Sequence, residues 1–244
     1  MEPEAYLDMA AVEARHWWFA GRRRVLAAAI RGMRLPANAR ILELGSGTGG
    51  NFAFLSSFGR VSAVEMNETA REISQARGQG AAVHHGMLPD NLPFEGHVFD
   101  LVCLFDVLEH IEEDDATLRT IRGLLAPGGR ALITVPAHPS LFGPHDIALH
   151  HKRRYTRAQL AAKLRAAGLR VQKLSFMNMA LAPCAFALRW LDRLRGARQA
   201  SGTSIPPAPV NTLFTWMFSA EAWVLPYADL PFGLSLLAVV SAAD

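Results

Sequence analysis

The sequence of 244 residues predicts an α/β fold in which helices cover both faces of a doubly wound, Rossmann-like sheet. Short apolar runs alternate with helical stretches from residue 39 to residue 176, and this alternation is typical of parallel strands joined by crossover helices. A glycine-rich turn directly follows the first apolar run. A separate apolar run closes the chain after a long, largely helical stretch.

Composition excludes several classes of protein. Hydrophobic residues make up 50% of the chain and charged residues 19%, with a formal net charge of +3. So much apolar surface excludes a disordered protein, and the positive charges are too scattered for a dedicated nucleic-acid binder. Cys103 and Cys184 are too few for a disulfide framework or a four-thiolate zinc site. The N-terminus does not resemble a signal peptide and no long uninterrupted apolar run occurs, so we expect a cytoplasmic protein without stable membrane insertion.

We expect one domain over residues 1–244, built from four consecutive parts. The parts are an N-terminal helical cap (1–37), a cofactor-binding core (38–176), a helical insertion (177–232) and a last strand (233–244). Residues 4–34 favour helix because they are rich in good helix formers and lack proline. Further helices are expected at 50–58, 67–78, 112–125, 156–167, 178–195 and 211–224. Strands are expected at 39–45, 59–65, 81–85, 99–105, 129–136, 169–176 and 234–241.

The glycine-rich turn ILELGSGTGG carries the sharpest functional signal. Gly45 and Gly47 let the backbone turn tightly and approach a ligand where a Cβ would clash. Glu65 ends the next strand, where a carboxylate can accept both hydroxyl hydrogens of a ribose. The spacing of Gly45, Gly47 and Gly50 also fits a nicotinamide or flavin dinucleotide, although Glu43 stands where dinucleotide sites carry an apolar residue.

Five motifs occur in register between residues 38 and 176: ELGSGTG, a second-strand VE, FDLV, LEHI and LAPGGRALITVP. In this order they resemble the class I S-adenosylmethionine-dependent methyltransferases, in particular a bacterial branch that acts on small molecules. The resemblance implies a seven-stranded sheet whose last strand is antiparallel. It also implies methyl transfer from S-adenosyl-L-methionine to a small-molecule acceptor, with oxygen favoured and nitrogen or sulfur open. An NAD(P)-dependent oxidoreductase and a non-catalytic partner subunit that keeps the fold are the alternatives.

The resemblance also assigns residues to the cofactor. The methionine part would be surrounded by Glu43, Gly45, Ser46 and Gly47, and the ribose hydroxyls would bind Glu65. The adenine would contact Met66, Met87 and Leu88. The methyl-transfer cleft would be lined by Phe105 and Asp106. Trp18 and Arg22 either anchor the N-terminal helix by packing or close on the cofactor, with the guanidinium binding its carboxylate.

The long loop after the fifth strand contains the candidates for a general base. Histidine suits removal of an acceptor proton near neutral pH. His145 could pair with Asp146 as base and orienting carboxylate; His150, His151 and Tyr155 are the other candidates, and the histidines could equally be ordinary loop residues. The basic run 152–154 is either solvated or a clamp for an anionic acceptor.

Asp106, Glu109 and His110 form the sequence D-V-L-E-H. This is similar to the E-x-x-E-H metal site of the ubiquinone-pathway O-methyltransferases, with aspartate in the first position. In many other members of the superfamily the L-E-H segment is structural. We therefore expect no bound metal here.

The insertion is rich in large apolar residues at helical spacing, including Leu213, Trp216, Met217 and Trp223. We expect these side chains to pack as ordinary core on the N-terminal helix. The alternatives are a roof over a large or partly apolar acceptor site, a homodimer interface, or a surface for a lipid-linked acceptor. We expect no binding to anionic vesicles.

Overall fold

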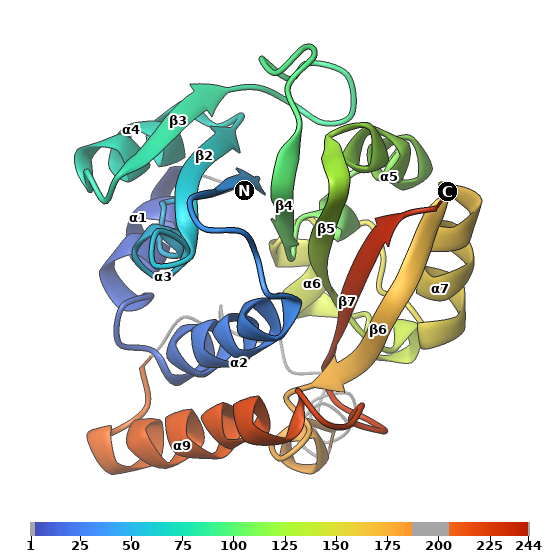
Figure 1. Cartoon of the computed structure of the whole chain (residues 1–244). Helices are drawn as coiled ribbons and strands as arrows, with labels where there is room; N and C mark the ends of the chain where they lie inside the picture. Colours follow the sequence, from blue (N-terminus) through green and yellow to red (C-terminus); the bar gives the residue numbers. More distant parts are fainter. Residues whose placement is uncertain (1–2, 187–204, 244) are drawn as a thin grey trace.

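The computed structural model describes residues 3–186 and 205–243, and it contains one seven-stranded sheet. The strands are β1 (Ala39–Leu44), β2 (Gly59–Glu65), β3 (Ala81–His85), β4 (Phe99–Phe105), β5 (Leu125–Pro136), β6 (Leu169–Met177) and β7 (Ser235–Ala242). They lie in the order β3-β2-β1-β4-β5-β7-β6, and β7 runs antiparallel to both of its neighbours. The predicted seven-stranded, doubly wound sheet with an antiparallel last strand is confirmed (Figure 1).

The order of the strands favours a ligand site at the carboxyl ends of β1 and β4. These two strands are adjacent and parallel, with Leu44 opposite Leu104, whereas the chain leaves them toward opposite edges of the sheet. Loops after such neighbouring strands diverge and leave room for a ligand. The glycine-rich turn follows β1, so the topology brings this turn beside the end of β4.

Helices cover both faces of the sheet (Figure 1). The helices that pack on one face are α5 (Asp114–Gly123) and α7 (Arg157–Ala166), and those on the other are α2 (Trp17–Met33), α3 (Phe52–Leu55) and α9 (Ala208–Val224). Along β3 and β2 lies α4 (Glu68–Ala76), and against it lies α1 (Pro3–Val12). At Gly21 of α2 an added Cβ would lie 2.7 Å from the Phe218 ring, so glycine permits the close approach of α9.

Three of the differences between the structure and the predicted elements concern the N-terminal helix, the glycine turn and the loop after β5. The single helix expected over 4–34 is two helices, because a turn follows α1 and the His16 side chain caps α2 by accepting from the Trp18 amide. The helix expected over 50–58 shortens to α3, because the glycine turn continues through Gly49, which has φ of +80°. The loop after β5 contains two short helices, η2 (Pro139–Leu141) and α6 (Pro144–Ala148), each beginning with a proline.

The helical insertion is described only in part. The helix expected over 178–195 begins as residues 182–186, and its remainder lies outside the described residues. The expectation that the apolar stripe of the second helix is core is wrong for Leu213, Trp216 and Trp223, whose side chains are exposed. They point away from α2, because α9 turns its opposite side, with Phe218, inward. No helix in the described part of the chain is long and apolar enough to cross a bilayer.

Candidate active site

The glycine turn after β1 needs glycine at two positions. Gly45 and Gly47 have φ of +71° and +53°, in the left-handed region that favours glycine. A Cβ on Gly45 would lie 2.6 Å from Val107 Cγ2. The amides of Gly45 and Ser46 donate to the Val64 carbonyl at 2.9 and 3.0 Å, and these bonds tie the turn to the end of β2.

Glu65, the last residue of β2, is buried beside this turn. One carboxylate oxygen accepts from the Gly47 amide at 2.8 Å and the other from the Asn67 amide at 2.8 Å. Each carboxylate oxygen can accept more than one hydrogen bond. Glu65 therefore shapes the turn and keeps capacity for two hydroxyl groups of a ligand.

Glu43 is a buried carboxyl group with one satisfied oxygen. Oε1 accepts from the Asn51 amide at 2.7 Å, whereas Oε2 has no hydrogen-bond partner in the described residues. Burial raises the pKa of Glu43 to about 8, against the lowering effects of Asn51 and Arg22. An unpaired buried carboxyl of this kind favours a cationic group of a ligand.

Arg22, on α2, is almost fully buried. Its Nη1 forms a hydrogen-bonded ion pair with Asp106, while its Nε has no partner in the described residues. The guanidinium lies 4.6 Å from the Trp18 ring centroid and 5.8 Å from that of Phe105. Asp106 follows β4 with φ of +55°, a conformation uncommon for residues other than glycine and often found at functional sites. The fold thus gathers Trp18, Arg22, Phe105 and Asp106 at one place.

Three unpartnered buried groups around the turn match the ends of an amino acid. They are Oε2 of Glu43, Nε of Arg22 and the hydroxyl of Ser46. A carboxyl group can bind an ammonium group, and a guanidinium together with a hydroxyl can bind a carboxylate. The residues present therefore fit a ligand with a zwitterionic amino-acid end and a ribose.

The residues expected at the adenine follow β2 and β3. Met66, next to Glu65, and Met87 are exposed, whereas Leu88 is half-buried and packs on the sheet core. Gly86 allows this chain segment to approach Asn91, because an added Cβ would lie 2.8 Å from the Asn91 carbonyl oxygen. The two exposed thioethers can cover a flat ring held beside Glu65.

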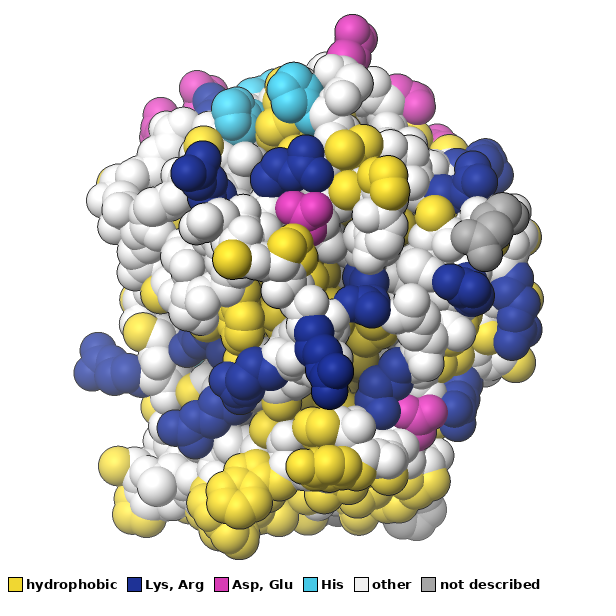
Figure 2. Space-filling view, in the orientation of Figure 1, with side chains coloured by type: hydrophobic (Ala, Val, Ile, Leu, Met, Phe, Trp, Pro, Cys, Tyr) yellow, Lys and Arg dark blue, Asp and Glu magenta, His cyan; other side chains and the backbone are white. Residues whose placement is uncertain are grey.

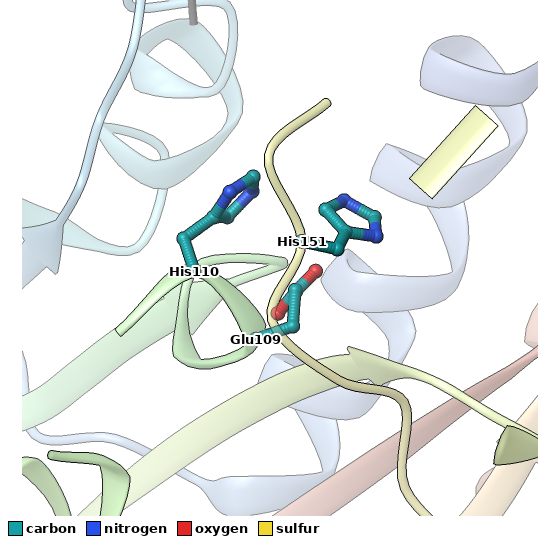
Figure 3. A group of neighbouring side chains, drawn as sticks. All are labelled: Glu109, His110 and His151. Carbon is teal, nitrogen blue, oxygen red and sulfur yellow. The ribbon is translucent and has the colours of Figure 1, made fainter. Parts of the chain in front are cut away.

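A second cluster lies next to Asp106 and contains Glu109, His110 and His151. Figure 3 shows the three side chains turned toward a common space, two from η1 (Leu108–His110) and His151 from the segment after α6. One ligand atom from each lies within 4.8 Å of the others. Both carboxyl oxygens of Glu109 are buried without a partner in the described residues. We call these three residues the acceptor-side cluster.

Electrostatics in the acceptor-side cluster favour uncharged groups. Burial and the nearby Asp106 carboxylate raise the pKa of Glu109 well above its ordinary value. Burial and the adjoining His151 ring lower the pKa of His110 to about 4, so His110 is neutral at physiological pH. Glu109 can donate a hydrogen bond in its protonated form, and His110 can accept one.

Asp146, the carboxylate that could pair with His145, forms a hydrogen bond with His151. Asp146 accepts from His151 Nδ1 at 2.9 Å and from Arg154 Nε at 2.7 Å. Burial alone would raise the pKa of Asp146, but these two bonds hold it well below its ordinary range. In the neutral tautomer that donates from Nδ1 to Asp146, the Nε2 atom of His151 can accept a proton. His150 is exposed, with φ of +58°.

Two further findings concern Tyr155 and the basic run 152–154. Tyr155 is buried and donates to Asp114 at 2.9 Å, and burial with the Asp114 charge raises its pKa well above the ordinary value, which favours a structural role over that of a general base. In the basic run, Arg153 pairs with Asp114 and Arg154 with Asp146, so both guanidinium groups are engaged by carboxylates of the protein itself.

The acceptor-side cluster differs from the metal-binding motif that D-V-L-E-H resembles. Asp106 turns to Arg22, and His151 supplies the third donor beside Glu109 and His110. One carboxylate and two imidazoles are a donor set found in catalytic zinc sites. These side chains could therefore hold a divalent ion, which would there lower the pKa of a hydroxyl bound to it.

Sequence reasoning missed the residues of α1, and of the turn that follows it, that contact the glycine turn. Glu13 is buried and accepts from the Thr48 hydroxyl at 2.6 Å, and it pairs with Arg77. Burial and the Glu65 charge raise the pKa of Tyr6 to about 12, and the Met9 methyl approaches Gly47. The only signal was the acidic and aromatic character of the N-terminus.

Comparison with known proteins agrees with this geometry. A family model described as a methyltransferase domain matches residues 16–174. The chain belongs to the S-adenosylmethionine-dependent methyltransferases. The ubiquinone biosynthesis O-methyltransferase of Xanthomonas axonopodis pv. citri is 30% identical to this methyltransferase over 200 residues, which cover 71% of this chain and 84% of that protein.

Solved structures share the fold of this methyltransferase. A Haloferax volcanii methyltransferase in complex with the Trm112 activator has a TM-score of 0.58 at 21% identity, and the match covers 96% of this chain and 98% of that one. Phosphoethanolamine N-methyltransferase 2 of Haemonchus contortus, in complex with S-adenosyl-L-methionine, has a TM-score of 0.59 at 17% identity and covers 90% of this chain and 52% of its own. Family membership decides against the oxidoreductase alternative.

Proposed function

We propose that this methyltransferase transfers the methyl group of S-adenosyl-L-methionine to a hydroxyl oxygen of a small-molecule acceptor. One observation carries the proposal: a histidine held by a buried carboxylate, His151 on Asp146, belongs to the cluster next to Asp106, and Asp106 pairs with Arg22, one of the groups that match an amino-acid zwitterion. The name of the Xanthomonas relative supports oxygen as the accepting atom.

The glycine turn and the residues around it would bind the cofactor. Glu43 would pair with the ammonium of the methionine part, and Arg22 with Ser46 would bind its carboxylate. Glu65 would accept the ribose hydroxyls, and Met66 would lie against the adenine. The bound cofactor supplies an electrophilic methyl group on a sulfonium, so the protein needs only to position the acceptor and remove its proton.

The acceptor-side cluster would hold the reacting hydroxyl. In-line transfer needs the oxygen about 3 Å from the methyl carbon, opposite the sulfur, and such positioning can contribute ~7–11 kcal/mol. His151 Nε2 would take the hydroxyl proton as the oxygen–carbon bond forms and the sulfur–carbon bond breaks. Asp146 is a positioning residue that stabilises the resulting imidazolium. Protonated Glu109 and neutral His110 would orient the hydroxyl by hydrogen bonds.

Methyl-labelled S-adenosyl-L-methionine and a panel of phenolic and aliphatic alcohols test this proposal. We expect label in a methyl ether for at least one alcohol. His151→Ala should lower kcat at least a hundredfold, within the range for loss of a general base, with the KM for the cofactor nearly unchanged. His150→Ala, a neighbouring exposed histidine, is the matched control and should keep full activity. Transfer only to amines or thiols, or full activity of His151→Ala, would refute the proposal.

A further inference from the structure

The outer side of α9 is an exposed apolar surface. The side chains of Leu213, Trp216, Trp223 and Tyr227 are 52%, 67%, 82% and 90% exposed. We call these four residues, together with Val210 and Val224, the α9 apolar face. Figure 2 shows this face as hydrophobic side chains gathered along the foot of the molecule. Exposed apolar patches of such continuity mark interaction surfaces in other proteins.

The α9 apolar face is not needed to hold α9 in place. The opposite side of the helix is anchored on α2, where Phe218 packs at Gly21 and the Asn211 side chain accepts from the Trp17 amide at 2.9 Å. Glu221 accepts from the amides of Asn178 and Met179 at 2.7 and 2.6 Å. Since Glu221 is buried and is the only charged residue between positions 199 and 228, the outer side carries no charge at all.

Three exposed arginines lie on α2 and at its C-cap, and α2 is the helix on which α9 packs. Arg24 donates from Nη1 to the Ser219 hydroxyl at 3.1 Å, which places it at the edge of α9. Arg31 and Arg34 are also exposed, and within the described residues none of the three forms an ion pair with a carboxylate. Figure 2 shows Lys and Arg side chains in a band directly above the apolar foot.

We propose that the α9 apolar face docks on the surface of a bilayer that contains anionic lipids. Tryptophan and tyrosine prefer the interface between headgroups and acyl chains, where α9 could lie flat over roughly 25 Å. Anionic headgroups supply the counter-charges that the arginines lack. A second copy docked through α9 would bring more arginines and no such counter-charges, so the charge pattern favours the bilayer. This proposal departs from our expectation of no vesicle binding, which was made before the exposure of these side chains was known. Contact at the interface requires no spanning helix.

Co-sedimentation of the full-length protein with vesicles tests the docking. We expect binding to phosphatidylglycerol–phosphatidylcholine vesicles, weaker binding in high salt, and little binding to phosphatidylcholine alone. Trp216→Ser combined with Trp223→Ser should reduce the partition coefficient at least tenfold, because two interfacial anchors are lost. Ile147→Ser removes an equally exposed apolar side chain from α6 and should leave binding unchanged.

The arginines are tested separately. Arg31→Gln combined with Arg34→Gln should weaken binding to anionic vesicles about twentyfold, since each basic residue near such a surface contributes roughly a fivefold gain. Arg119→Gln combined with Arg165→Gln, on α5 and α7, is the charge-matched control. Wild-type protein that stays in the supernatant, or tryptophan variants that still bind fully, would overturn the proposal. So would concentration-dependent dimerisation in ultracentrifugation that the tryptophan substitutions abolish, because a second copy would then cover the face.

Discussion

Binding of S-adenosylhomocysteine at neutral pH should release protons from Glu43. Burial raises the pKa of this carboxyl to about 8, so roughly nine-tenths of the free protein carries the proton at pH 7. The homocysteine ammonium would sit against the unpartnered Oε2. An opposite charge at such a distance lowers a carboxyl pKa by about one to three pH units. Binding at pH 7 should therefore release roughly 0.4 to 0.9 of a proton.

Calorimetric titration in buffers of different ionisation enthalpy measures this number. The observed binding heat should differ between the buffers in proportion to the protons released. Glu43→Gln keeps an oxygen that can accept from Asn51, but it has no proton to lose. The binding heat of this variant should therefore lack the buffer-dependent part that comes from residue 43. Glu68→Gln, on the exposed side of α4, is the control and should behave as wild type. Equal proton release by wild type and Glu43→Gln would refute the assignment of Glu43 to the ammonium.

The same carboxyl predicts how the stability of the ligand-free protein depends on pH. The pKa of Glu43 is higher in the folded chain, about 8, than the ordinary value of 4.5 expected after unfolding. Between these values the folded state holds the proton and the unfolded state does not, so the free energy of unfolding falls as the pH rises. Urea unfolding at pH 5, 6.5 and 8 should show this decline, and Glu43→Gln should show a smaller one. An equal decline in both proteins would assign it to other groups.

Three further predictions concern the ribose site, the acceptor-side cluster and a buried tyrosine. Glu65→Ala should weaken S-adenosylhomocysteine binding on the order of a hundredfold, because charge-assisted hydrogen bonds to the ribose are lost; unchanged affinity in calorimetry would show that the ribose lies elsewhere. Dialysis against EDTA should leave kcat unchanged if His151 alone removes the proton, whereas loss of activity that added Zn²⁺ restores would assign the cluster to a metal. Tyr155→Phe should lower the free energy of unfolding by about 1 kcal/mol with kcat intact, because its hydroxyl bonds Asp114; a large fall in kcat without loss of stability would contradict this structural role.

Local sequence signals predicted the frame of the site because they depend on residues close together in the chain. The apolar runs set the strands, and the glycine turn after β1 requires Gly45 and Gly47 for backbone reasons alone. Glu65 could be placed because parallel strands end at one edge of the sheet. Element ends were less predictable, since the start of α2 depends on one side-chain hydrogen bond from His16 and the extent of the glycine turn on the backbone conformation of Gly49.

The tertiary structure decided which polar groups meet. Arg22 and Asp106 are far apart in the chain, and only the packing of α2 over the end of β4 joins them. The same dependence on packing gave Asp146 to His151 and buried Tyr155 as a structural donor. Helical spacing showed that α9 has an apolar stripe, but spacing cannot say which side meets another helix. The packing of Phe218 against Gly21 sets which side of α9 meets α2. Because a helix can turn only one side to its neighbour, Trp216 and Trp223 remain exposed to solvent.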